Sequence, residues 1–374
     1  MALTLMDGNE AVAWGAFDAG CRFFAGYPIT PATGIYSTML RILPPAGGIV
    51  LQGEDEIASL GFCLGASMAG YKAMTATSGP GISLFSENIS LAIGSEIPVV
   101  IVDVQRLGPS TGYATKGADG DIQFLRWGNS GGIPPIVLAP VDVADCYTLT
   151  IHAFNLAERF RTPVFVAPSK EIGMTRESVD FDRLVASRPA PVERLPNPSD
   201  SPYIPFRVAA GEDVPRFAPI GGETISRQTS STHGEEGYIT SDSSVISAQV
   251  ARLYRKIEAT VDEFSFYQAD TADGSETLVI TYGVTSRAAR RACVELRAEG
   301  RSVSQLFLKT LWPVPETLIR NIAEPYRRIL VVEANLGQYV REVEHVLKNK
   351  TVDFLGVMDG RLIEPVRIKE VLRE

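Results

Sequence analysis

Short apolar and β-branched runs recur along the first 190 residues, and segments with helical spacing separate them. The runs are RFFAGYPI, GGIVLQG, YKAMTATS, IPVVIVDVQ, IPPIVLAP and TPVFVAPS, and helical spacing occurs over residues 8–20 and 143–159. Strands that alternate with helices predict a parallel sheet. Strands this apolar are typical of a sheet that is covered on both faces. We therefore expect residues 1–190 to form one doubly wound α/β domain.

Residues 191–270 have a different character. Proline, glycine, serine and threonine are frequent up to about residue 245, yet the stretch keeps aromatic residues such as Tyr203, Phe206 and Phe217. A free linker would not need these side chains. We expect an ordered connecting segment that packs on another surface and ends in an amphipathic helix near residues 245–266.

The alternating pattern resumes in the last hundred residues. The runs ETLVITYG, SVSQLFLKTLW, RRILVVEANLG and VDFLGVMDG read as strands, and helical patterns lie between them. This predicts a second, smaller α/β domain over residues 271–374.

Composition limits the classes of function. The chain has 374 residues, 45% hydrophobic and 21% charged, which are ordinary values for a globular protein. No apolar run reaches the ~18 residues needed to cross a bilayer, and the first residues lack the basic and apolar regions of a signal peptide. The expected location is the cytoplasm. The net charge of −9 argues against a nucleic-acid binder.

Cysteine and histidine spacing predicts no metal site in this chain. The four cysteines, Cys21, Cys63, Cys146 and Cys293, are far apart, no Cys-x-x-Cys occurs, and the three histidines are dispersed. We expect the four cysteines to be buried thiols. Any iron–sulfur cluster would then belong to other chains.

The stretch LQGEDEIASLGFCLGASMAG, residues 51–70, contains a candidate catalytic acid. A strand ends, acids follow, and a helix begins that carries many small residues. Charge at a helix N-terminus explains Glu54, Asp55 and Glu56 structurally, at about 0.3–1 kcal/mol each. A helix with so small a face also allows another helix or a ligand to approach closely. A carboxylate in that contact would be desolvated and would need a partner.

A second candidate is the turn Ser78, Gly79, Pro80 and Gly81, which ends one predicted strand and begins a helix. Its glycines permit a backbone geometry and a close approach that a Cβ would prevent. By itself the turn is a weak signal, because any tight connection between a strand and a helix could use it.

The two stretches in this order resemble the pyrimidine-binding domain of thiamine diphosphate enzymes. The resemblance implies that Glu56 contacts N1′ of the cofactor's aminopyrimidine in a general acid–base relay. It also implies that the turn of residues 78–81 borders the cofactor. Residues 271–374 resemble the C-terminal domain of transketolase-like enzymes, which we interpret as structural and interface-forming.

The stretch GYPITP, residues 26–31, resembles a signature of the 2-oxoacid:ferredoxin oxidoreductases. The resemblance continues through QRLGPSTG and VVEANLGQYVREVE, and it covers nearly the whole chain. The chain resembles the alpha subunit of the multi-subunit forms of these enzymes, in particular those acting on 2-oxoglutarate. It implies that Thr30 and Arg106 approach the substrate carboxylate and that Tyr27, Pro28 and Ile29 border the cofactor.

The chain departs from that pattern after Gly112. GYATKGADGDI stands where many relatives have a proline-containing step and an acidic–amide stretch. Pyruvate, branched-chain and aryl 2-oxoacids therefore stay open as substrates. Lys116 or Arg126 could meet a distal carboxylate, although solvated surface charge is the favoured interpretation. ADGD does not qualify as a magnesium motif, because no strand precedes it and no asparagine follows at the required spacing.

The resemblance implies one subunit of a complex. A beta subunit would hold the diphosphate and Mg²⁺, so that the two chains share thiamine diphosphate, and partners would carry [4Fe-4S] clusters. The reaction would convert a 2-oxoacid and CoA to acyl-CoA and CO₂ and pass electrons to ferredoxin or a similar acceptor. Gamma and ferredoxin-like subunits and a dimer of heteromers are expected. A non-oxidative thiamine diphosphate enzyme and a scaffold without chemistry are the alternatives.

Overall fold

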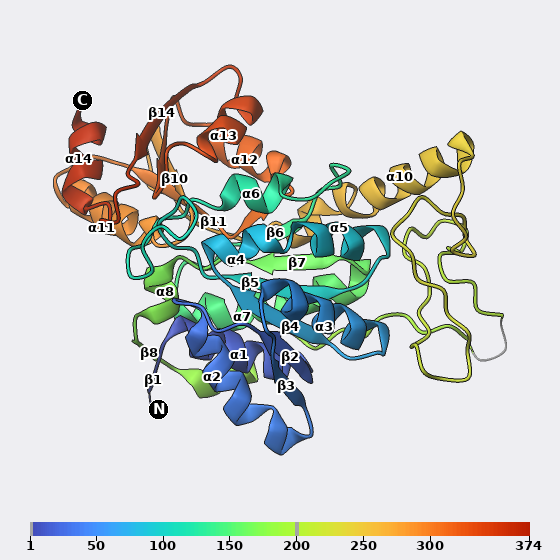
Figure 1. Cartoon of the computed structure of the whole chain (residues 1–374). Coiled ribbons are helices and arrows are strands. Elements are labelled where there is room, and N and C mark those ends of the chain that lie inside the picture. Colours follow the sequence, from blue (N-terminus) through green and yellow to red (C-terminus); the bar gives the residue numbers. More distant parts are fainter. Residues whose placement is uncertain (1–2, 199–201) are drawn as a thin grey trace.

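The structure, a computed structural model, describes residues 3–198 and 202–374. Residues 199–201 of the predicted connecting segment lie outside the described part. Two sheets with their helices form the body, and an arm that ends in a long helix projects from one side (Figure 1).

The first sheet has seven strands in the order β12-β6-β7-β5-β4-β2-β3. Six are the apolar runs predicted from the sequence, and they are mutually parallel. These are β2 (Phe23–Gly26), β3 (Ile49–Gln52), β4 (Ala73–Thr77), β5 (Val99–Asp103), β6 (Ile136–Leu138) and β7 (Pro163–Val166). The seventh, β12 (Thr310–Trp312), pairs antiparallel with β6 and comes from the C-terminal third of the chain, which the sequence did not predict.

Helices cover both faces of this sheet, which confirms the doubly wound fold. On one face are α1 (Gly8–Asp18), α2 (Thr33–Ile42) and α7 (Val143–Phe160), and on the other are α3 (Glu56–Met68), α4 (Gly79–Leu84), α5 (Ser86–Gly94) and α6 (Ile122–Trp127). Along β5, Val100 and Val102 point into the core with α1 and α7, whereas Val99 and Ile101 point into the core with α3 and α5. This alternation follows from the period of two in a strand.

Short elements complete the first half of the chain. They are η1 (Pro44–Ala46), α8 (Lys170–Met174), α9 (Phe181–Ala186) and a two-stranded antiparallel sheet of β1 (Thr4–Met6) and β8 (Glu177–Val179).

The second sheet has the order β14-β13-β10-β11-β9. Its strands are β9 (Tyr267–Asp270), β10 (Thr277–Thr281), β11 (Ser304–Leu308), β13 (Arg328–Glu333) and β14 (Thr351–Gly356), and only β9 is antiparallel to its neighbour. Helices α11 (Thr285–Ala298) and α14 (Pro365–Arg373) cover one face. Helices α12 (Glu316–Ala323) and α13 (Val340–Val346) share a single core with the first sheet.

Two strands belong to a sheet outside the proposed sequence segment that contains them. Strand β9 precedes residue 271 but is an edge strand of the second sheet, and β12 follows it but belongs to the first. The division into three domains stays a proposal. One hydrophobic core contains residues of both sheets.

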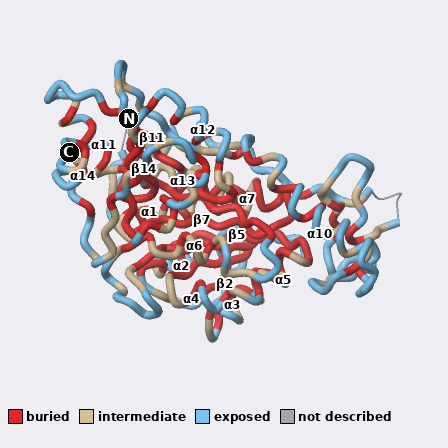
Figure 2. The backbone as a smooth tube through the Cα atoms, turned by 90° about the horizontal axis from the view of Figure 1, so that it is seen from above, coloured by how far each residue is buried: buried red, intermediate tan, exposed pale blue. Residues whose placement is uncertain are grey.

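The connecting segment packs through some of its aromatic residues. Phe206 and Phe217 are buried, and the ring of Phe206 lies 3.9 Å from that of His233. Helix α10 (Ser243–Glu258) and η2 (Val261–Phe264) follow. Leu253 and Ile257 are buried, whereas the apolar Val250 of the same amphipathic helix is exposed, because the first half of α10 projects from the body (Figures 1 and 2).

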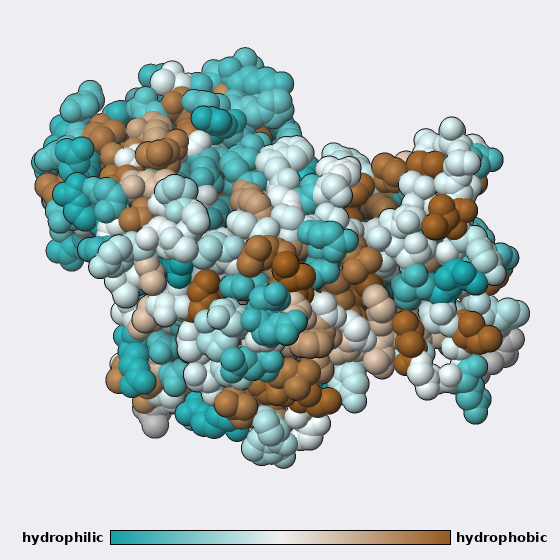
Figure 3. Space-filling model, in the orientation of Figure 1, coloured by the Kyte–Doolittle hydropathy of each residue, from teal (hydrophilic) through white to brown (hydrophobic). Residues whose placement is uncertain are grey.

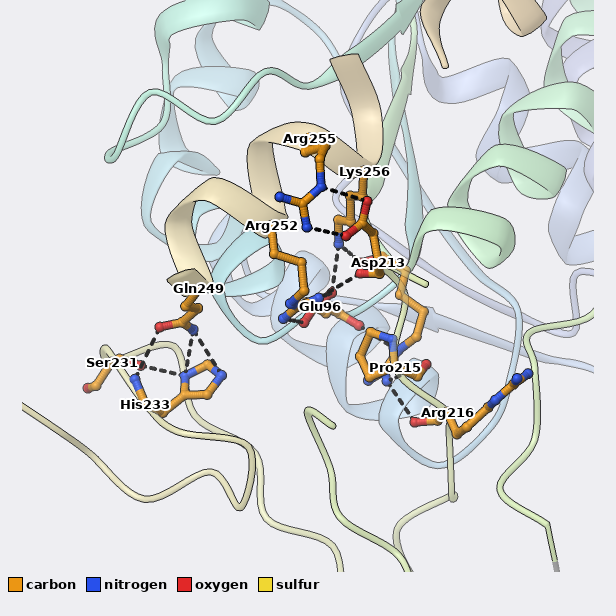
Figure 4. A network of polar contacts seen from close by, with 11 residues as sticks. Glu96, Asp213, Pro215, Arg216, Ser231, His233, Gln249, Arg252, Arg255 and Lys256 are labelled. Carbon is orange, nitrogen blue, oxygen red and sulfur yellow. Dashed lines mark hydrogen bonds and ion pairs between the residues drawn. The ribbon is translucent and has the colours of Figure 1, made fainter. Parts of the chain in front are cut away.

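A buried group of charges fixes α10 to the body (Figure 4). The Glu96 carboxylate accepts hydrogen bonds from Arg252 at 2.6 and 3.0 Å and from Lys256 at 2.8 Å. Arg161 donates to the carbonyl oxygens of Pro215 and Arg216 in the connecting segment. We call these residues the Glu96 network.

All four cysteines are free and buried, as predicted. Among the described residues, no helix is both long and apolar enough to span a membrane.

Candidate functional site

The sequence-predicted site residues come from loops at one edge of the first sheet. Residues 27–31 follow β2, Glu56 follows β3, residues 78–81 follow β4, and Arg106 follows β5. Because these strands are parallel and adjacent, their carboxyl ends lie at the same edge. Ligands of open α/β sheets bind at such edges.

Glu56 is the first residue of α3 and packs directly against the turn of residues 78–81. The Asp55 side chain caps the helix by accepting from the Ala58 N–H at 2.7 Å. Glu56 is only 8% exposed. A Cβ at Gly81 would lie 2.8 Å from Oε1 of Glu56 and 2.0 Å from Oγ1 of Thr77, so position 81 requires glycine. The structure thus brings Glu56 and the turn together, while their roles stay predictions.

The outer face of α3 is open. A Cβ added at Gly61 or at Gly65 would meet no described atom within 4 Å, and the neighbouring side chains of Ile57 and Phe62 are about half exposed. Apolar surface gathers over the region of β2, β3 and α3 (Figure 3). The small face that the sequence predicted is therefore uncovered at Gly61 and Gly65, whereas the small residues Ser59 and Ser67 are buried by this chain.

The other side of the turn meets Arg106. A Cβ at Gly79 would lie 3.8 Å from Cγ of Arg106 and 3.9 Å from Oδ2 of Asp121. Ser78 is fully buried, and its hydroxyl oxygen has no hydrogen-bond partner among the described residues. Gly79 and Pro80 are partly exposed at the surface of the turn. The turn thus lies between Glu56 and Arg106.

Arg106 joins two loops. Its side chain is buried, Nη1 donates to the Thr30 carbonyl oxygen at 2.7 Å, and Nη2 donates to the Thr111 carbonyl oxygen at 2.8 Å. Nε is buried without a described partner. The Thr30 side chain remains exposed. Two residues predicted as substrate-binding, Thr30 and Arg106, are therefore in direct contact.

The rest of the GYPITP loop lies over this contact. Tyr27 is exposed, and Pro28 and Ile29 are partly buried. Buried Asn9 on α1 donates to the Pro31 carbonyl oxygen at 2.8 Å and ties the loop to the body. The prolines and this hydrogen bond restrict the loop. A ligand that binds there would therefore cost the loop less conformational entropy.

Lys116 and Arg126 do not join this group. Lys116 packs its side chain against Gly360 of the second domain. The Arg126 guanidinium stacks on Trp127 at 3.9 Å, and desolvation by burial lowers its pKa. The exposure of Lys116 agrees with the favoured interpretation as solvated surface charge, whereas Arg126 is only partly exposed and its Nη1 is buried; that neither meets the substrate stays a prediction.

Two buried aspartates and one partly buried aspartate at the same edge were missed as site residues. Asp103 ends β5, and Asp119 and Asp121 lie just before α6. Burial raises the pKa of Asp103 well above its usual range, and Asp121 raises it further. Burial also raises the pKa of Asp119 to about 7 and that of Asp121 to about 6. The signal was the position of Asp103 at the carboxyl end of a buried strand; ADGD was weighed only as a magnesium motif.

The second domain supports the loop that carries two of these acids. Asn335 donates to the Asp119 carbonyl oxygen at 2.8 Å, and Gln338 Oε1 accepts from the Gln123 N–H at 2.9 Å. The strand-to-helix turn after β13 thus contacts the first half of the chain, while the interpretation of this domain as structural and interface-forming stays a prediction.

Two protein families match most of the chain. The family described as "Pyruvate flavodoxin/ferredoxin oxidoreductase, thiamine diP-bdg" matches residues 14–252. The family described as "Pyruvate:ferredoxin oxidoreductase core domain II" matches residues 275–368.

Individual relatives match over their full length. The 2-oxoglutarate synthase subunit KorA of Methanocaldococcus jannaschii is 40% identical over 100% of both chains. The ketoisovalerate oxidoreductase subunit VorB of Methanothermobacter thermautotrophicus is 34% identical over 100% of this chain and 98% of its own. A solved structure, 2-oxoglutarate:ferredoxin oxidoreductase from Magnetococcus marinus with 2-oxoglutarate, coenzyme A and succinyl-CoA bound, matches at 31% identity with a TM-score of 0.92. The match covers 99% of this chain and 65% of that one. The chain therefore belongs to the pyruvate flavodoxin/ferredoxin oxidoreductase family.

Proposed function

We propose that this chain is the alpha subunit of a thiamine diphosphate-dependent, CoA-acylating 2-oxoacid:ferredoxin oxidoreductase that acts on 2-oxoglutarate. The reaction would convert 2-oxoglutarate and CoA to succinyl-CoA and CO₂ and pass two electrons to a low-potential acceptor such as ferredoxin. The similarity to KorA subunits and to the Magnetococcus marinus enzyme supports this substrate. The VorB relatives make a branched-chain 2-oxoacid the second candidate.

The position of Glu56 carries the proposal. Glu56 is 8% exposed and packs against Gly81 beside an open helix face, and no hydrogen bond from the described residues occupies its side chain. Its carboxylate oxygens are not among the fully buried polar atoms, so they stay accessible to a ligand that supplies a donor. An aminopyrimidine with a protonated ring nitrogen would supply that donor, so the residues present fit thiamine diphosphate.

The chain's residues would bind and orient. Glu56 would hold the proton at the pyrimidine nitrogen, and residues 78–81 would leave room for the ring because Gly81 lacks a side chain. Thiamine diphosphate, when bound, supplies a nucleophilic carbon and an electron sink for decarboxylation. The buried charge of Arg106 and the exposed hydroxyl of Thr30 would bind the substrate carboxylate.

Partner subunits would complete the site. The open face of α3, with Gly61 and Gly65, suits close approach by the beta subunit. That subunit would hold the diphosphate and Mg²⁺, and partners would carry the [4Fe-4S] clusters. We further propose that gamma and ferredoxin-like subunits are present, that the assembly is a dimer of heteromers, and that it resides in the cytoplasm.

Replacing Glu56 by glutamine in the reconstituted complex tests the assignment. Glutamine keeps the size of the side chain but cannot hold the proton as a carboxylate does, so turnover should fall by about a hundredfold or more. Assembly and 2-oxoglutarate binding should stay intact. Glu54→Gln is the matched control, because Glu54 is exposed two residues earlier. Turnover of Glu56→Gln within threefold of the wild type would reject a catalytic Glu56.

Replacing Gly65 by leucine tests the partner surface. In the free chain the new side chain meets open space and improves helix propensity, so stability should not fall. Affinity for the partner subunit, measured by calorimetry, should fall about tenfold or more, because the helix can no longer be approached closely. Arg291→Leu, at an exposed position of α11, is the control. Unchanged affinity in Gly65→Leu would place the partner elsewhere.

A further inference from the structure

Asp103 and Asp121 form a pair of acids that requires a proton. Their carboxyl groups are in hydrogen-bond contact with each other, which raises the pKa of Asp103 beyond the effect of burial. Both oxygens of Asp103 and Oδ2 of Asp121 are buried and make no standard hydrogen bond to the described residues, and the backbone N–H of Gly79 beside Asp103 lowers its pKa only in part. Two carboxylates in such contact cannot both be ionised. A proton held by Asp103 and donated to Asp121 satisfies both side chains.

The pair lies beside the proposed substrate arginine. Oδ2 of Asp121 and Cγ of Arg106 are 3.9 and 3.8 Å from the same point, the position of a Cβ at Gly79. Arg106 donates to two carbonyl oxygens, but among residues 3–198 and 202–374 no carboxylate lies within 4.0 Å of it. The Arg106 guanidinium therefore has no direct ion pair among these residues. Asp121 is close enough for Arg106 to lower its pKa.

We propose that Asp103 and Asp121 share one proton and act as an adjustable counter-charge to Arg106, so that an anionic substrate binds with uptake of a proton by Asp121. The inference rests on the proposed function in one respect, namely that Arg106 receives a substrate carboxylate. Asp103 and Asp121 are positioning residues, because they act on the substrate through Arg106.

The direction of the linkage follows from the charges. When Asp121 is ionised, it neutralises Arg106 and weakens the attraction for a carboxylate. When a carboxylate binds, it adds a negative charge beside Asp121 and favours the protonated form. Because the pKa of Asp121 is about 6 in the free chain, binding should weaken as the pH rises through that range and above it. Asp119 raises the pKa of Asp103, and Glu171 and Glu333 raise that of Asp119; the Lys170 ammonium pairs with Glu171 at 3.1 Å.

Glutarate, a dicarboxylate without the reactive 2-oxo group, is the probe. Its affinity for the assembled complex is measured by calorimetry between pH 5.5 and 8 in two buffers that differ in ionisation heat, which also gives the number of protons taken up. In the wild type, we expect affinity to fall by about fivefold or more over this range, with net proton uptake near pH 7. In Asp121→Asn, proton uptake should vanish. The affinity for glutarate should then not change with pH, apart from the effect of the ionisation of glutarate itself.

Asp103→Asn provides the second test. Its amide can still donate to Asp121, so the pH dependence of glutarate binding should match the wild type. Infrared spectra of complex with isotope-labelled aspartate should show a protonated carboxyl band above pH 7 in the wild type, and Asp103→Asn should lose part of that band. If the acids had a purely structural role, both variants would change the stability of the complex. Neither variant would then selectively lose the proton uptake that accompanies glutarate binding.

Two results would overturn the proposal. One is wild-type pH dependence and proton uptake in Asp121→Asn, and the other is their loss in Asp103→Asn that folds and assembles. A complex that oxidises no 2-oxoacid would instead reject the proposed function, while the glutarate titration still decides on the pair.

Discussion

The two ends of strand β5 carry two buried groups of charged side chains with opposite balance. Just before the strand, Glu96 is paired with Arg252 and Lys256. Burial alone would raise the pKa of Glu96, but Lys256 and Arg252 overcome it and hold the pKa at about 2. At the last residue of the strand, Asp103 meets Asp121, and its pKa is raised.

The difference separates a structural role from a chemical one. In the Glu96 network each charged side chain is hydrogen-bonded, Arg252 and Lys256 to the carboxylate and Arg161 to carbonyl oxygens, which fixes α10 and the connecting segment in place. At the other end of β5, acids crowd together and destabilise one another, an arrangement that clusters at functional sites. One strand thus joins an anchor at its amino end to the candidate site at its carboxyl end.

Removing the charge of Glu96 should have the largest effect on stability. Glu96→Gln would leave Arg252 and Lys256 buried without a carboxylate, at a cost of about 3–5 kcal/mol in the free energy of unfolding at pH 7. The wild-type contribution is present above pH 4.5, the ordinary pKa, and is lost as the pH falls toward 2. Denaturant titration measures both. A loss below 1 kcal/mol would contradict the anchor interpretation.

Removing the charge of Asp119 should have the opposite sign. Burial raises its pKa from 3.8 to about 7, so the folded chain keeps a proton that the unfolded chain releases. This lowers wild-type stability as the pH rises from about 4 to 7. Asp119→Asn should therefore be more stable than the wild type at pH 8, by on the order of 2–4 kcal/mol, and similar to it at pH 4. Equal stability at both pH values would refute the assignment of an uncompensated acid.

The smallest effect is expected at the edge of the Glu96 network. Glu212 pairs with Arg216 at 2.8 Å, and both side chains are about a third exposed or more. Glu212→Gln should change the free energy of unfolding by less than about 0.5 kcal/mol, because water screens such pairs. The same denaturant titration serves as control for the two larger changes. A loss comparable to that of Glu96→Gln would show that exposure does not distinguish these ion pairs.

Much of the fold could be predicted because its signals are local. The six parallel strands are compact apolar runs, and the helices between them have clear spacing. That Glu56 and residues 78–81 border one ligand was implied by the family resemblance, and parallel strands place their following segments at one edge even though β2 lies between β3 and β4. Thr30 and Arg106 likewise share this edge with β4 between their strands, but their direct contact depends on the path of the loops.

The rest depends on contacts between distant parts of the chain. A single residue separates β11 from β12 (Thr310–Trp312). Nothing in the sequence of β12 indicates that it pairs with β6 of the first sheet and not within the second sheet. The exposure of Val250 depends on how far α10 extends beyond the body. Asp103 and Asp121 are separated by a long loop, and their contact depends on its path.

Strand β12 constrains how this protein can be divided. A chain cut between residues 270 and 310 would leave the first sheet without its edge strand and would expose the unpaired backbone of β6. If the gene were split there, the two products would have to associate to pair the exposed edge of β6, and neither would be an independent evolutionary module. Fusions and permutations that succeed should therefore keep this crossing strand and its host sheet in one polypeptide.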